Sequence, residues 1–120
     1  MALSIATRQL DGVTILDLSG RITLGEGSVQ LRDAIRDLIG KGDKQILLSL
    51  GNVNYIDSSG LGELVSAYTT AKNQNAEVKL LNLTKKVKDV LQVTKLYTVF
   101  ATYTDENEAV GSFSKAAAGA

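Results

Sequence analysis

A short run of carboxylate, hydroxyl and glycine residues in the middle of the chain is the strongest candidate for chemistry. Asp57, Ser58 and Ser59 follow an apolar stretch and are followed by Gly60 and Gly62. A phosphoryl group on a serine hydroxyl adds a charge of about −1.5 to −2 near neutral pH. A helix N-terminus favours negative charge, so the domain would tolerate a phosphate at Ser58 if a helix begins here. A modification that the domain tolerates and a partner does not is what a docking switch requires.

The same residues also have a purely structural interpretation. Aspartate and serine are the commonest N-caps of helices, so Asp57 or Ser58 could serve only to start a helix. The two glycines, Gly60 and Gly62, could let that helix pack closely on a sheet, or let another backbone approach. From the residues alone the capping interpretation is favoured, and it is compatible with a switch because the cap acts in the unmodified state.

The composition argues against most enzymatic chemistry. The chain has no histidine and no cysteine, so triads, imidazole proton transfer and most transition-metal sites are excluded. We therefore predict a protein that is not an enzyme and that has no cofactor and no metal. Thirteen basic residues balance thirteen acidic ones, which predicts neither direct nucleic-acid binding nor membrane insertion. No export signal is apparent, and we expect a cytoplasmic protein.

The apolar pattern predicts one α/β domain over residues 1–114, followed by a mobile C-terminal tail at residues 115–120. Alternation on both sides of Asp11-Gly12 indicates an antiparallel hairpin. Strands and helices then alternate, which predicts a mixed, mostly parallel sheet with about four helices packed on it. The expected strands are residues 3–8, 13–18 with an extension at 21–24, 45–50, 78–83 and 99–103. The expected helices run from residue 28 to Gly40 and from residue 61 to Asn75, with a short third capped by Thr84 and a fourth opened by residues 104–106.

Residues 57–62, preceded by a strand and apolar Tyr55 and Ile56, resemble the phosphorylation loop of the anti-sigma factor antagonists of the STAS family. The hexapeptide reads Asp-Ser-Ser-Gly-Leu-Gly. The likeness covers essentially the whole chain. It includes the opening hairpin that ends at Ser19-Gly20, the strand at 46–50, and residues 87–91 with Leu96 and Phe100 beyond them.

This resemblance implies a partner-switching cycle. The unphosphorylated antagonist binds an anti-sigma factor that is itself a serine kinase, and the sigma factor is freed. The kinase phosphorylates Ser58, which releases the partner, and a metal-dependent serine phosphatase acting on phospho-Ser58 resets the cycle. The residues that the resemblance implies as partner contacts are Asp57, Ser59, Gly60, Leu61 and Gly62. Arg21 and Thr23 stand where many of these antagonists carry acidic residues.

Two other function classes remain open. A constitutive STAS adaptor in a signalling scaffold or a transporter complex would have the same fold without the switch. A small hydroxyl- or carboxylate-based enzyme, or a nucleotide binder, is the third. The lysines at residues 85, 86 and 88 are interpreted as a solvated face, although a contact with an acidic partner or a phosphate is the alternative. Tyr55 is interpreted as a half-buried packing residue.

Overall fold

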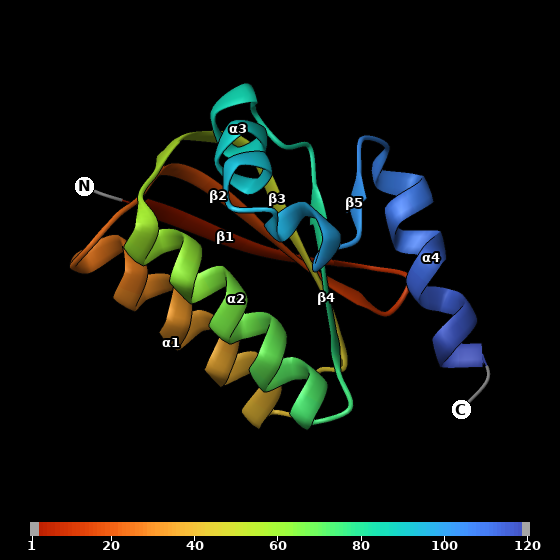
Figure 1. The fold of residues 1–120 in the computed structure, drawn as a ribbon. Helices are drawn as coiled ribbons and strands as arrows, with labels where there is room; N and C mark the ends of the chain where they lie inside the picture. Colours follow the sequence, from red (N-terminus) through yellow and green to blue (C-terminus); the bar gives the residue numbers. More distant parts are fainter. Residues whose placement is uncertain (1–2, 119–120) are drawn as a thin grey trace.

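The computed structural model describes residues 3–118 as a single sheet with helices packed on it (Figure 1). The strands lie in the order β1-β2-β3-β4-β5; β1 and β2 are antiparallel, and the remaining pairs are parallel. The predicted α/β fold, with its mixed sheet and four α-helices, is confirmed. In chain order the elements are β1 (Leu3–Leu10), β2 (Val13–Ile22), α1 (Glu26–Gly40), β3 (Gln45–Ile56), α2 (Ser58–Asn73), β4 (Glu77–Leu81), α3 (Lys85–Val93), a 3₁₀ turn (Leu96–Thr98), β5 (Thr102–Tyr103) and α4 (Glu106–Ala118).

The hairpin between β1 and β2 follows directly from its two turn residues. Leu10 pairs with Val13, so the loop is Asp11 and Gly12 alone. Both have positive φ, 51° and 82° respectively. That is the backbone of a type I′ turn, whose twist matches the twist of the flanking strands. The predicted hairpin is confirmed.

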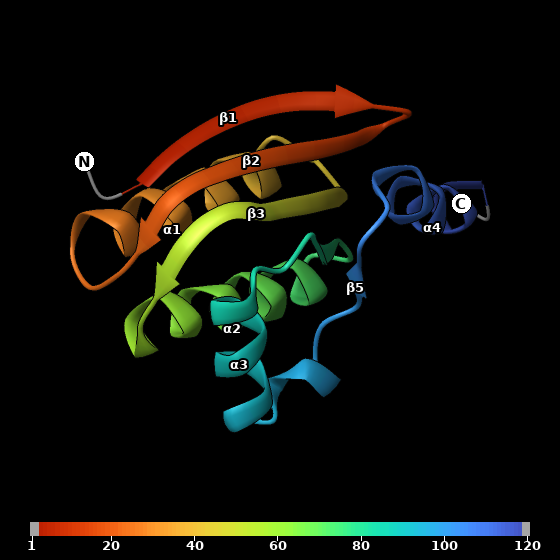
Figure 2. The same cartoon turned by 90° about the horizontal axis from the view of Figure 1, so that it is seen from above.

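The sheet has a large core on one face and a smaller one on the other. Ile46 and Leu48 of β3 belong to the core covered by α1 and α2, whereas Leu47 between them belongs to the core beneath α4. Because successive side chains of a strand point to opposite faces, an apolar run in β3 is buried on both sides. Figure 2 shows α4 at one end of the sheet, away from the starts of α1 and α2.

Some element boundaries differ from the prediction. β3 continues past Leu50 to Ile56, because its second half pairs with the second half of β2. β2 is one strand through Ile22, with register shifts in its ladder to β3 on either side of Gly20. β5 has only two residues, since the chain before it forms the 3₁₀ turn.

The C-terminal helix reaches further than predicted. α4 runs to Ala118, and residues 119–120, the end of the expected tail, lie outside the described residues. The mobility of residues 115–120 stays a prediction. Within residues 3–118, no helix combines the length and the apolar character needed to cross a membrane.

Candidate functional site

The start of α2 is fixed by the carboxylate of Asp57. One carboxylate oxygen accepts a hydrogen bond from the Gly60 N–H at 2.9 Å, and the other accepts one from the Leu24 N–H at 3.0 Å. Asp57 has an extended backbone with φ −108° and is the N-cap, so Ser58 is the first residue of the helix. The capping interpretation of these residues is confirmed, with Asp57 rather than Ser58 as the cap, and the helix begins before the expected residue 61.

Asp57 therefore joins two segments that are distant in sequence. Its carboxylate ties the loop after β2 to the first turn of α2, and its own N–H donates to the Ile22 carbonyl at 3.3 Å. The hydrogen bonds from the Gly60 N–H and then the Leu24 N–H lower the pKa of Asp57 below its usual value, because they stabilise the ionised form. The carboxylate remains charged at neutral pH and holds the loop after β2 against the first turn of α2.

Only one of the two glycines of the loop is required by the packing of α2. A Cβ on Gly60 would lie 2.0 Å from the Ile22 carbonyl oxygen and 2.8 Å from the carbon of that carbonyl. Such a contact with backbone leaves no room for any side chain, so Gly60 is required by the packing of α2 on β2. A Cβ on Gly62 would meet nothing within 4 Å, and Gly62 is exposed. The packing interpretation therefore explains Gly60 and leaves Gly62 unexplained.

The residues of the loop differ in accessibility. Ser58 and Gly62 are exposed, and Asp57 and Ser59 are half-buried. Gly60 and Leu61 are buried; Leu61 is 6% exposed and belongs to the main core. The Ser58 hydroxyl is thus on the surface, at a helix start where the dipole favours an anion.

Several residues around this loop make contacts that the sequence did not indicate. Leu24, whose N–H is held by Asp57, is a 79% exposed apolar side chain. The ring of Tyr55 is 37% exposed and is contacted by two cations: the guanidinium of Arg21 lies 5.2 Å and the ammonium of Lys86 lies 4.9 Å from its centroid. Each such contact contributes about 0.5–1 kcal/mol at an exposed site. Arg21 and Tyr55 are brought together by their pairing in the β2–β3 ladder, which joins segments distant in sequence.

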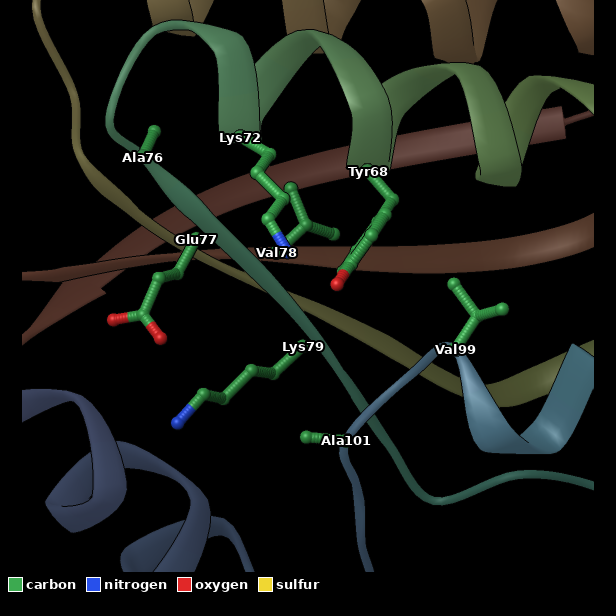
Figure 3. A pocket seen from close by; sticks show the side chains of 8 residues that line it. All are labelled: Tyr68, Lys72, Ala76, Glu77, Val78, Lys79, Val99 and Ala101. Carbon is green, nitrogen blue, oxygen red and sulfur yellow. The ribbon is translucent and has the colours of Figure 1, made fainter.

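A pocket of about 220 Å³ lies at the other end of α2 (Figure 3). Tyr68 and Lys72 project from α2 toward β4, while Val99 closes the pocket from the segment before β5. The Lys79 ammonium donates to the Ser112 hydroxyl at 2.9 Å and so is held against α4. This pocket shares no lining residue with residues 57–62 and is a separate feature of the surface.

Comparisons with known proteins agree with this architecture. The family model described as STAS domain matches residues 4–109. The anti-sigma F factor antagonist of Paenibacillus polymyxa is 28% identical over 113 residues, covering 92% of this chain and 94% of the relative. The anti-sigma-B factor antagonist of Bacillus subtilis is 27% identical over 96 residues, covering 80% and 86%.

Solved structures show the same fold. SpoIIAA in its unphosphorylated form superimposes with a TM-score of 0.79 at 20% identity, covering 93% of this chain and 97% of that one. The phosphorylated form of the Bacillus protein superimposes with a TM-score of 0.72, also at 20% identity, covering 92% and 99%.

Proposed function

This chain belongs to the STAS domain family, and we propose on that premise that it is an anti-sigma factor antagonist switched by phosphorylation of Ser58. Unphosphorylated, it binds an anti-sigma factor that is a serine kinase, and the sigma factor is freed. The kinase transfers a phosphoryl group to Ser58, and the complex dissociates. A metal-dependent serine phosphatase restores the active form. The domain is a binding module and a substrate, and it works in the cytoplasm without catalysing a reaction.

The names of the relatives support the general function. One is an antagonist of anti-sigma F factor and the other of anti-sigma B factor, and both align with at least four fifths of this chain. A neighbour of the same fold, SpoIIAA, has been solved in phosphorylated and unphosphorylated forms.

The exposed position of Ser58 as the first residue of α2 is the observation that carries the proposal. A kinase can reach this hydroxyl without unfolding the domain. Because Asp57 supplies the cap, the hydroxyl of Ser58 is not needed to start the helix. A phosphate there would lie at the positive end of the helix dipole, so the fold would accept a charge that a docked partner would have to bury.

The neighbouring residues divide into two roles in this proposal. Ser59 and Gly62 meet the partner directly, since they are at least partly accessible. Asp57, Gly60 and Leu61 act by shaping the loop: the first through its hydrogen bonds and the other two through packing against β2 and the core.

The test is phosphorylation by defined kinases. Each serine-kinase anti-sigma factor encoded in the same genome is purified and incubated with this protein and ATP, and the modified residue is located by tandem mass spectrometry. We expect phosphate on Ser58 in the wild type and in Ser59→Ala, and none in Ser58→Ala. Phosphate on Ser59 alone would show that the acceptor is misassigned. No phosphate with any kinase, and none on this protein isolated from cells, would favour a constitutive adaptor in a scaffold or transporter complex.

A further inference from the structure

Three elements bring two cations onto one aromatic ring, that of Tyr55, which precedes Ser58 by three residues in the sequence. Arg21 comes from the end of β2, Tyr55 from the end of β3, and Lys86 from the first turn of α3. The start of α3 is attached to β3, because the Thr84 hydroxyl donates to the Val53 carbonyl at 3.0 Å. In Figure 1, α3 and the start of α2 lie near the same end of β3.

Neither cation is neutralised by an acidic side chain that the structure describes. Among residues 3–113, no carboxylate oxygen lies within 4.0 Å of the charged nitrogens of Arg21 or Lys86, whereas Lys85 pairs with Asp89 at 3.1 Å. The carboxylate of Asp57 accepts two backbone hydrogen bonds instead. A lysine in the first turn of a helix also opposes the helix dipole, so the position of Lys86 is not explained by the stability of α3.

The elements that carry the two cations, or the loop next to them, also carry exposed apolar side chains. Leu24 is 79% exposed on the loop held by Asp57, and Val93 is 83% exposed on α3. Lys86, Val90 and Val93 are spaced four and three residues apart, so they lie along one side of that helix. Large apolar side chains surrounded by charged residues are typical of protein docking surfaces.

We infer that this surface, formed by Leu24, Ser58, Tyr55, Arg21 and Lys86, receives an acidic surface of the partner protein, whose carboxylates pair with Arg21 and Lys86. The inference rests on the proposed function and adds that the docking surface of the partner is negatively charged. Unneutralised cations attract carboxylates, and Tyr55 holds both cations in position before the partner arrives. Phosphate on Ser58 then repels the same carboxylates, so the negative charge of the partner's docking surface explains why phosphorylation causes release.

The first test compares two double variants with equal charge change. Arg21→Gln with Lys86→Gln removes the cations of this surface. Lys41→Gln with Lys72→Gln removes two exposed lysines at the far ends of α1 and α2. Binding to the purified kinases is measured by calorimetry at about 50 and 200 mM salt. We expect Kd to rise at least about tenfold for the first pair, with loss of most of the salt dependence, and to stay within about twofold for the control. Equal effects of the two pairs would overturn the inference.

A second test needs no cognate partner. The ¹⁵N-labelled protein is titrated with a capped peptide of ten glutamates and, separately, with one of ten lysines. We expect the glutamate peptide alone to shift the amides of Arg21, Tyr55 and Lys86, and the Arg21→Gln/Lys86→Gln variant to lose these shifts. Shifts elsewhere only, or equal shifts with both peptides, would contradict the inference.

The two tests separate the two proposals. If no kinase binds or phosphorylates the protein but the glutamate peptide shifts the amides of this surface, the proposed function fails, and the preference of the surface for carboxylates stands. If a kinase phosphorylates Ser58 while the Arg21→Gln/Lys86→Gln variant binds it like the wild type, the proposed function stands and the acidic partner surface is wrong.

Discussion

The contrast between Gly60 and Gly62 gives the sharpest test of how α2 is positioned. Gly60→Ala places a methyl group 2.0 Å from the Ile22 carbonyl oxygen, whereas a van der Waals contact needs more than 3 Å. The obstacle is backbone, so the start of α2 must move away from β2 by about 1 Å or more. Overpacking of this kind costs about 1–3 kcal/mol. The movement also weakens the hydrogen bond from the Asp57 N–H to Ile22, which is worth about 0.5–1.5 kcal/mol.

We therefore expect Gly60→Ala to lower the free energy of unfolding by about 2–4 kcal/mol, and Tm by roughly 8–16 °C for a domain of this size. Gly62→Ala is the matched control: it lies in the same helix, is exposed, and has open space around its Cβ. It should stabilise the domain by about 0.5–1 kcal/mol through higher helix propensity. Urea unfolding of both variants measures the difference. Equal stabilities for the two would refute the close packing of α2 on β2.

Other predictions concern the cap and the attachment of α4. Asp57→Ala should cost about 1–2 kcal/mol at pH 7, measured by urea unfolding, because it leaves two backbone donors without their acceptor. Because the pKa of Asp57 is lowered in the folded state, the ionised carboxylate stabilises the domain above about pH 4, and this stabilisation is lost as the pH falls through the folded-state pKa. The difference in unfolding free energy between wild type and Asp57→Asn should therefore shrink below about pH 4. Arg8 pairs with Asp17 and Glu106 on the surface, so Arg8→Gln should cost at most about 1 kcal/mol and less at high salt, as checked by thermal melting. Phe113→Ala, in the core beneath α4, should cost about 3–5 kcal/mol by the same measurement.

The local signals in the sequence predicted the parts of the fold that depend on neighbouring residues. Asp11-Gly12 specified its turn, and Asp57 marked a helix start because its side chain can reach the N–H three residues later. Thr84 was predicted as a cap and accepts from the Val87 N–H at 3.4 Å.

The features that were not predicted depend on contacts between distant segments. The polar residues after Leu50 looked like a loop, and only the ladder with β2 makes them a strand that places Tyr55 beside Arg21. Nothing near Leu24 in the sequence indicates that Asp57 holds its N–H. The approach of Gly60 to Ile22 is likewise visible only when α2 is packed on the sheet.

The central claim is that a negative charge on Ser58 releases the partner without disturbing the fold. The direct measurement is calorimetric titration of the cognate kinase with the stoichiometrically phosphorylated protein and with Ser58→Asp and Ser58→Ala, using Ser66→Asp, an exposed serine two turns further along α2, as the control. We expect all four proteins to melt as folded domains, with Ser58→Asp within about 1 kcal/mol of wild type. Ser58→Asp should bind at least about tenfold more weakly, or roughly 1.4 kcal/mol, and the phosphoprotein more weakly still. Ser58→Ala and Ser66→Asp should keep most of the affinity. Wild-type affinity in a folded Ser58→Asp protein and in the phosphoprotein would contradict the account and leave Ser58 as no more than the first residue of a helix.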